Sequence, residues 1–291
     1  VNIIAADNRN PEICGKVLGC GELESEFRAT QIDSMAVIDN GKQVIVNTND
    51  CPFEIAENTA KIIKNDYKNI DLLLVGYTGA SSYPQCFNFE KKDMNVEKIK
   101  KTEKRLGNAL SYVEIFNPRC FMPFAGRYTL AGKNYVMNEN RGEPDLDFAL
   151  EYLSKRVDET KNKCLGLNSK ENFDLDTNKI SKPYKKIDLK KKDHYIKNVL
   201  SKIKYDFEEN LNIDNETIIK LLPESYSRFN STRQKIGYST ETKIILEISD
   251  KNVVVVSVNG EGYEIISPEE SKKIEKYIKI KTDIRLLYWL L

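Results

Sequence analysis

Apolar and polar positions in the first half of the chain switch between the strand period and the helix period. Residues 34–38 and 43–47 are β-rich runs around Asp39-Asn40-Gly41, and Asn-Gly between such runs predicts a β-hairpin. The continuous apolar run 71–76 is typical of a strand covered on both faces of a sheet. Apolar residues at i, i+4 spacing within 54–64 predict an amphipathic helix. Strands and helices thus alternate up to about residue 158, as in a layered α/β domain.

The same patterns predict further elements and a division of the chain. These elements are a strand at 1–6, a helix at 95–116, a strand at 119–124, helices at 145–157, 195–209 and 215–222, a hairpin of 243–248 with 253–258, and a helix beginning near Pro268. Between about 158 and 192 the composition shifts to Lys, Asn, Asp and Ser. We therefore expect an α/β region at 1–158, a polar linker at 159–192 and an α+β region at 193–291.

Composition and charge exclude some partners. The chain has 45 Lys+Arg against 44 Asp+Glu, so it lacks the global basic field that attracts proteins to nucleic acid. No run of about 18 apolar residues occurs, and the first residues do not resemble a signal peptide. The six cysteines show no paired CxxC spacing, which indicates reduced thiols. We expect a cytoplasmic protein that binds neither nucleic acid nor a membrane.

Both ends of the sequence have unusual features. The chain begins with Val1, and it ends on the apolar run 286–291. An apolar terminus normally needs to be covered. We expect that a partner chain or a further segment of the polypeptide covers it.

A carboxylate follows the predicted hairpin. The strand at 43–47 leads into Asn49-Asp50-Cys51-Pro52, and a helix is predicted directly afterwards. Because sites in α/β sheets gather at the carboxyl ends of strands, Asp50 could bind a divalent metal or orient a water molecule. Alternatively, its side chain caps the following helix by accepting hydrogen bonds from backbone N–H groups.

The loop at 76–87 follows a predicted buried strand and is rich in glycine and small hydroxylic residues. Such a loop can bring backbone amides close to a ligand. It lacks the Gly-Lys-Ser/Thr ending of a P-loop and is not a dinucleotide-binding fingerprint. The alternative is a tightly turned structural loop.

Four strings together carry a family resemblance. They are Ile32-Asp33-Ser34-Met35-Ala36-Val37, Asn47-Thr48-Asn49-Asp50-Cys51, Gly79-Ala80-Ser81-Ser82-Tyr83-Pro84 and Pro123-Phe124-Ala125-Gly126. In order and spacing, over about residues 30–136, the chain resembles the metallo-β-lactamase-like part of the CMP-N-acetylneuraminate and UDP-N-acetylmuramate hydroxylases. The resemblance implies an α/β fold, a four-layer αββα sandwich that is incomplete at its N-terminus, followed by an α+β C-terminal extension.

The resemblance also implies a metal site at one sheet edge, with Asp50 as a ligand and histidines completing the coordination of zinc or iron. His194 is the only histidine, and it lies in a Lys-rich stretch that predicts a solvated helix residue. Arg127 stands directly after the Pro-Phe-Ala-Gly string. Either the chain is a fragment without the first half of the fold, or the site has been lost and no metal is bound.

Two functions follow from the resemblance, and neither assigns a catalytic residue. The first is a metal-dependent hydrolase or oxygenase-associated domain acting on a nucleotide sugar or surface-polysaccharide precursor. Its expected substrate-binding residues are Thr78, Gly79, Ser81, Ser82 and Tyr83. The alternative is a catalytically inactive module that binds a sugar phosphate through Arg127, Lys133 and the loop amides. The metal content of the protein separates these two hypotheses.

Overall fold

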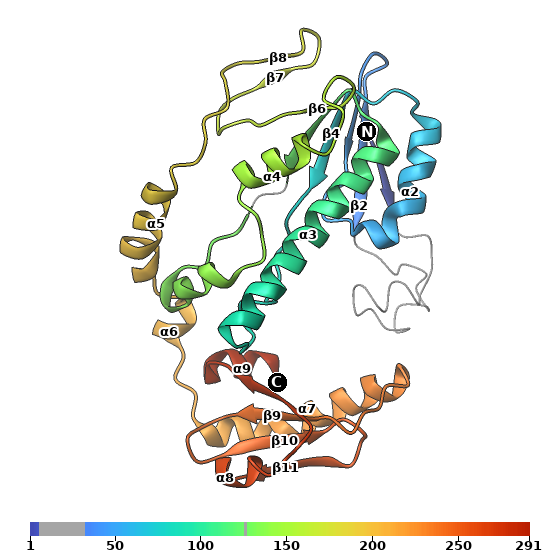
Figure 1. Cartoon of the computed structure of the whole chain (residues 1–291). Coiled ribbons are helices and arrows are strands. Elements are labelled where there is room, and N and C mark those ends of the chain that lie inside the picture. Colours follow the sequence, from blue (N-terminus) through green and yellow to red (C-terminus); the bar gives the residue numbers. More distant parts are fainter. Residues whose placement is uncertain (6–32, 125–126) are drawn as a thin grey trace. The chain divides into compact units, whose positions relative to one another are not determined.

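The computed structural model describes residues 1–5, 33–124 and 127–291, so Ile32 of the first string and Ala125 and Gly126 of the fourth lie outside it. The chain divides into two compact units, Val1–Ile203 and Lys204–Leu291. Both units combine helices with a sheet (Figure 1). The mixed α/β class expected from the sequence is therefore confirmed.

A six-stranded sheet organises the first unit. Its strands, in spatial order, are β1 (Asn2–Ala5), β2 (Ser34–Asp39), β3 (Val44–Asn47), β4 (Leu72–Gly76), β5 (Cys120–Phe124) and β6 (Lys163–Cys164). The first three strands are antiparallel neighbours, whereas β3 to β6 run parallel. The carboxyl ends of β3, β4 and β5 consequently share one edge of the sheet.

The predicted hairpin is β2 and β3, and local side chains shape its turn. Asp39 Oδ1 accepts a hydrogen bond from the Gly41 N–H at 2.7 Å, and Asn40 Oδ1 accepts one from Gln43 N–H at 2.8 Å. Gly41 adopts a φ of 82°, which residues with a Cβ rarely tolerate. The turn is thus encoded within a few residues.

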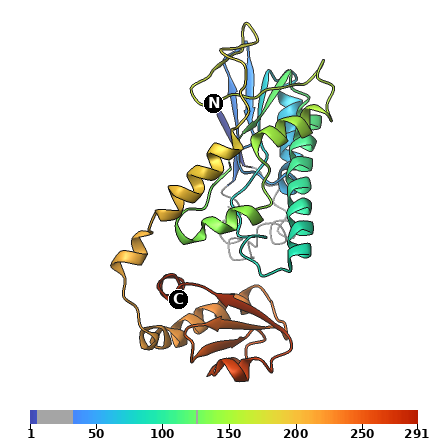
Figure 2. The same cartoon turned by 60° about the vertical axis from the view of Figure 1, so that its left-hand side comes forward.

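Helices cover one face of this sheet. Among the described residues, the helical segments of the first unit are α2 (Phe53–Asp66), α3 (Lys91–Phe116), η2 (Gly132–Asn140), α4 (Leu146–Ser154), α5 (Leu189–Asn198) and η3 (Leu200–Lys202). Buried residues of α2, α3 and α4 pack with Met35, Val46, Leu73 and Phe121 of the strands in one apolar cluster. Figure 2 shows α3 running alongside the sheet. The core therefore positions the first half of α3 near the carboxyl edge of the strands.

The other face of the sheet has a smaller cluster. Leu72 and Cys120 are buried there with Leu165, against Phe173 at the start of the small hairpin. That hairpin consists of β7 (Phe173–Asp174) and β8 (Lys179–Ile180). The segment 159–192, expected as a linker, instead belongs to the first unit, because β6 pairs with β5 and the hairpin covers part of the sheet.

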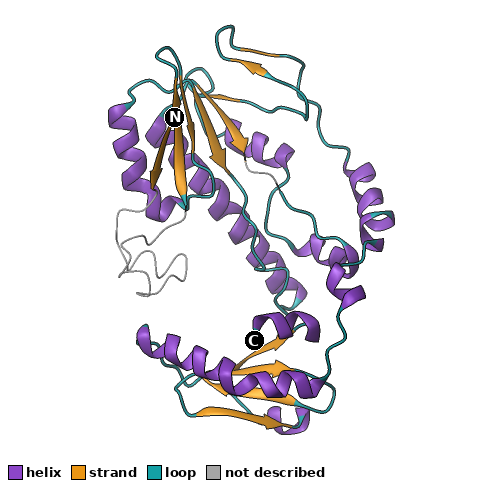
Figure 3. Cartoon of the chain, turned by 180° about the vertical axis from the view of Figure 1, so that it is seen from behind, coloured by secondary structure: helices purple, strands orange, loops and turns teal. Residues whose placement is uncertain are grey.

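The second unit contains a four-stranded sheet between helices. Its elements are α6 (Asp206–Asn210), α7 (Asn215–Lys235), β9 (Lys243–Glu247), β10 (Val253–Ser257), β11 (Gly262–Ile266), α8 (Pro268–Ser271), β12 (Tyr277–Lys281) and α9 (Ile284–Leu290). The order is β11-β10-β9-β12, with β12 parallel to β9 and the other pairs antiparallel. Figure 3 shows α7 lying across this sheet. Ile218 and Leu222 of α7 pack with Val254 and with Leu287 of α9.

Some predicted elements have different limits in the structure. The helix expected at 195–209 is interrupted: α5 ends at Asn198, and a new helix, α6, begins after Tyr205, whose backbone N–H donates a hydrogen bond to the Glu208 carboxylate at 3.0 Å. The helix expected at 215–222 continues through Pro223 to Lys235. The apolar C-terminal run forms α9, with Leu287 buried while Trp289 and Leu290 stay exposed. Across the described helices, none combines the length and apolar character that a bilayer-spanning segment requires.

Candidate functional site

The predicted site residues gather where three parallel strands end. Asp50 follows β3, the loop at 76–87 follows β4, and Arg127 lies three residues beyond β5. The first two strand ends come very close together, because a Cβ on Gly76 would stand 2.8 Å from the carbonyl oxygen of Asn49. This is the edge at which α/β sheets bind ligands.

Asp50 is exposed at this edge. The alternative that it caps the next helix is wrong: α2 begins after Pro52, with no side-chain hydrogen bond at its N-cap. Burial and then the charge of Asp50 raise the pKa of Asp33, so the two carboxylates are near one another. Within the described part of the chain, no three His, Cys, Asp or Glu side chains come together to hold a metal. The role of Asp50 as a metal ligand stays a prediction.

Cys51, next to Asp50, belongs to the apolar core. Its side chain is buried, and burial, followed by the charges of Asp33 and Asp50, raises the pKa of the thiol to about 12. A thiol with such a pKa is not a nucleophile near neutral pH. Cys51 is therefore a packing residue.

Hydrogen bonds within the loop at 76–87, and one from Tyr128, hold this loop in place. The Ser81 carbonyl accepts hydrogen bonds from Gln85 Nε2 and from the Tyr128 hydroxyl, the latter at 2.8 Å, and Ser81 Oγ accepts one from the Tyr83 N–H at 3.1 Å. Thr78 is buried and Ser82 is exposed. The structure thus favours the structural-loop alternative for Ser81.

Two other loop residues face the basic side of α3. A Cβ on Gly79 would stand 2.8 Å from Nη2 of Arg105. Tyr83 lines a hollow of about 410 Å³ together with Lys100 and Lys104 of α3. Tyr83 therefore lines a hollow and Gly79 lies beside Arg105, while their role in substrate binding stays a prediction.

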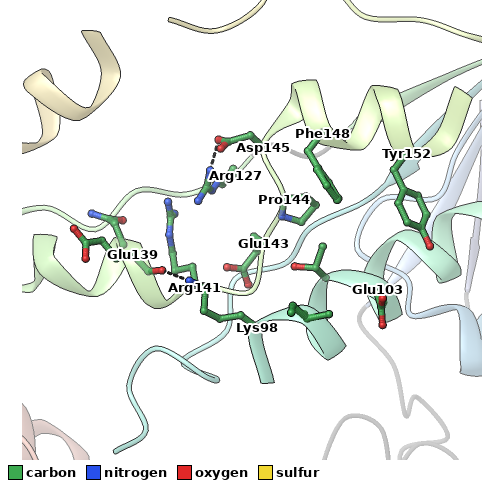
Figure 4. A pocket seen from close by; sticks show the side chains of 13 residues that line it. Lys98, Glu103, Arg127, Glu139, Arg141, Glu143, Pro144, Asp145, Phe148 and Tyr152 are labelled. Carbon is green, nitrogen blue, oxygen red and sulfur yellow. Dashed lines mark hydrogen bonds and ion pairs between the residues drawn. The ribbon is translucent and has the colours of Figure 1, made fainter. Parts of the chain in front are cut away.

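A larger hollow lies beside the other side of α3, and we call it the arginine pocket. It has a volume of about 450 Å³ and is lined by side chains of α3, η2 and α4, by Arg127, and by the segment from Arg141 to Asp145 (Figure 4). A second hollow of about 300 Å³, reaching α5, shares five lining residues with it: Arg127, Asn138, Glu139, Arg141 and Asp145. The two arginines therefore lie between two cavities.

The carboxylates nearest to these arginines already have cationic partners. Glu143 forms a buried ion pair with Lys101 of α3. Asp145 forms ion pairs with Arg127 and, at 2.7 Å, with Lys192 of α5. Burial by itself raises the pKa of Asp145, but the hydrogen bond from Lys192 and the charge of Arg127 outweigh it, and the pKa lies below its usual value.

Arg141 is the exception among these charges. It is only 4% exposed, and within the described residues it has no ion pair, while its Nε and Nη1 atoms have no hydrogen-bond partner. Its guanidinium lies 5.0 Å from the centre of the Tyr128 ring. Burial and then the charge of Arg127 lower its pKa, although Glu143 counteracts part of this. A buried cation in this state is suited to pair with an anionic ligand.

The pocket also offers apolar surface. Phe148 and Tyr152 on α4 line it opposite the arginines, and Ile99 of α3 contributes to the same cavity (Figure 4). Phe148 is half exposed. Aromatic side chains beside cationic groups can hold a sugar or base ring while an attached anion binds the arginines.

Part of this site is predictable from the sequence. Arg127, one of the residues expected to bind a sugar phosphate, lines the pocket, whereas Lys133 is exposed on η2 and is not among the residues that line it. Arg141, Glu143 and Phe148 were missed. The one local signal for this part of the pocket was the glycine at position 142. A Cβ on Gly142 would stand 2.9 Å from Cβ of Lys101, so the segment packs tightly against α3.

His194 lies outside the pocket. It is exposed on α5, and its ring Nδ1 is 3.2 Å from Nδ2 of Asn198. The prediction of a solvated helix residue is confirmed.

Comparisons of this chain with family models, with curated proteins and with solved structures find no match. The function proposed below consequently rests on the geometry of the site and on the resemblance carried by the four strings.

Proposed function

We propose that the first unit binds a phosphorylated sugar, with nucleotide sugars as the expected class, in the arginine pocket. Arg141 and Arg127 would contact the anionic group, and Phe148 would lie against a ring of the ligand. The observation that carries the proposal is the buried side chain of Arg141, which has no ion pair among the described residues. This proposal corresponds to the catalytically inactive sugar-phosphate-binding module expected from the sequence, except that Arg141 takes the anion-binding role that was expected of Lys133.

The energetics of buried charge support this choice. Leaving a cation buried without a partner costs several kcal/mol, on the order of the whole stability margin of a small domain. Glu143 and Asp145 do not relieve that cost fully, because Lys101, Arg127 and Lys192 already pair with them. A ligand phosphate or carboxylate that accepts hydrogen bonds from Arg141 would compensate the charge.

Isothermal titration of the full chain with UDP-N-acetylglucosamine, UDP and inorganic phosphate tests the proposal. We expect measurable binding of the nucleotide sugar and a loss of more than about tenfold in affinity for Arg141→Gln, since a charge-assisted hydrogen bond contributes about 1.5–3 kcal/mol. Arg119→Gln is the matched control, because Arg119 precedes β5 at the opposite edge and pairs with Asp71. Equal affinities of both variants, or no binding by the wild type, would refute the proposal.

A metal-dependent hydrolase of the metallo-β-lactamase fold is the second candidate, and two observations favour it. Burial, and after it the negative charge of nearby Asp50, raises the pKa of the Asp33 carboxyl group. The sheet face turned away from α2 and α3 carries exposed apolar residues, Ile3, Ile38 and Phe124. Such a face suits the second sheet of an αββα sandwich. The four-layer architecture is part of this proposal.

Elemental analysis of the purified chain for zinc, iron and manganese tests the second candidate. We expect near-stoichiometric metal in the wild type and a clear decrease in Asp50→Ala, because a carboxylate ligand is removed. Asp39→Ala serves as a control, since Asp39 is an exposed carboxylate in the hairpin turn. An equal metal content in the wild type and Asp50→Ala, or no metal in both, would exclude Asp50 as a ligand.

A further inference from the structure

The second unit has an open strand at one edge of its sheet. β12 pairs with β9, and no other described strand pairs with it. All five of its residues are exposed. A strand with one unpaired edge can form main-chain hydrogen bonds to an added strand.

Hollows lie beside this edge on the face of the sheet that α7 covers. The register pairs Ile278 with Ile244 and Ile280 with Leu246, so both β12 isoleucines point to that face. Ile280 lines an apolar cavity of about 190 Å³, and Ile278 lines a neighbouring cavity of about 250 Å³. Phe229 of α7 lines both. Alternate side chains of a strand added to β12 would lie beside these two cavities.

One of the cavities also contains an unused donor. The Tyr226 hydroxyl of α7 is buried, and among the described residues it has no hydrogen-bond partner. Tyr226 lines the cavity of about 190 Å³. A polar group of an incoming segment could accept a hydrogen bond from it.

The opposite face of β12 carries an excess of positive charge. Lys279 and Lys281 both pair with one carboxylate, that of Glu247, the second at 3.3 Å. The side chain of Lys281 is 83% exposed. Acidic residues of an added strand would be attracted to these lysines, whereas basic residues in the same positions would be repelled.

From this arrangement we propose that β12 and α7 form a docking groove for an extended peptide segment that alternates apolar and acidic side chains. The apolar side chains would enter the two cavities, and the acidic ones would face Lys279 and Lys281. A second copy of β12 is a poorer occupant, because antiparallel self-pairing would bring these lysines toward those of the other strand. This groove lies within the second unit and is independent of the arginine pocket.

Fluorescence anisotropy with two labelled peptides, one alternating glutamate with valine and one alternating lysine with valine, tests the groove on the full chain. We expect the glutamate peptide to bind more tightly, and Lys281→Glu to reduce this preference by about threefold or more, as for an exposed ion pair. Lys220→Glu introduces the same charge change on the exposed side of α7 and should leave the preference unchanged. Ile280→Asp should abolish binding of both peptides.

The preference is a ratio measured within each variant, so a partial loss of folded protein affects both peptides alike. Equal binding of the two peptides, no binding at all, or a preference unaltered by Lys281→Glu would overturn the proposal. Sedimentation analysis adds a further outcome: a wild-type dimer that Ile280→Asp converts to a monomer would show that a second copy occupies the groove instead.

Discussion

Replacing Lys101 with methionine is expected to lower the unfolding free energy of the first unit by about 3–5 kcal/mol, since it leaves a buried carboxylate without its cation. The side chains of Lys101 and Glu143 are 10% and 0% exposed, and the second oxygen of Glu143, Oε2, has no hydrogen-bond partner among the described residues. Water therefore has little access to the Glu143 carboxylate and cannot replace the lost interaction with Lys101. Methionine preserves most of the volume of the lysine stem, so packing changes little.

Lys100→Met is the matched control. Lys100 precedes Lys101 on α3 and pairs with Glu97, but its side chain is 64% exposed. Exposed pairs contribute little to stability, so the effect should be several times smaller. The double variant Lys101→Met/Glu143→Gln should recover much of the loss, because it removes the uncompensated charge.

Urea denaturation of the full chain can assign these effects to the first unit. The single tryptophan, Trp289, lies in the second unit, so its fluorescence reports on that unit, whereas far-UV circular dichroism reports on both. The transition that tryptophan fluorescence does not detect belongs to the first unit. If Lys101→Met and Lys100→Met shift this transition equally, the buried pair stabilises the first unit no more than the exposed pair does.

Local chemistry explains which parts of the fold were predictable. The hairpin of β2 and β3 depends on Asn40 and Gly41, which act within their own turn. The strand β4 is a continuous apolar run and the helix α2 has a clear helical periodicity, and the structure places both within two residues of the predicted limits. By contrast, β12 was not predicted, although Ile278-Lys279-Ile280-Lys281 alternates apolar and polar residues with the period of a strand.

The arginine pocket depends on contacts between distant residues. Lys101 and Glu143 are separated by 42 positions, and the burial of Arg141 follows from the packing of its segment against α3. In the sequence, Arg141-Gly142-Glu143-Pro144-Asp145 has the composition of an exposed turn. Periodicity describes the faces of single elements, and it contains no information on which charged turn a helix covers.

Arg141→Met is expected to have the opposite effect on stability from Lys101→Met. Exchanging a buried, unpaired cation for an apolar side chain of similar length should raise the unfolding free energy of the first unit by about 1–4 kcal/mol. The neighbouring carboxylates keep their partners, because Glu143 remains paired with Lys101 and Asp145 with Arg127 and Lys192. The contact with Tyr128 is replaced by one between sulfur and the aromatic ring.

The same variant should lose affinity for nucleotide sugars, and this combination identifies Arg141 as a binding residue. A residue retained for the fold would lower stability when replaced, whereas a residue retained for an anionic ligand is held at a cost to stability. Urea denaturation and isothermal titration of Arg141→Met measure the two effects separately. Lower stability with unchanged affinity would assign Arg141 to the core of the first unit, because a ligand that pairs with this guanidinium cannot bind equally well without it.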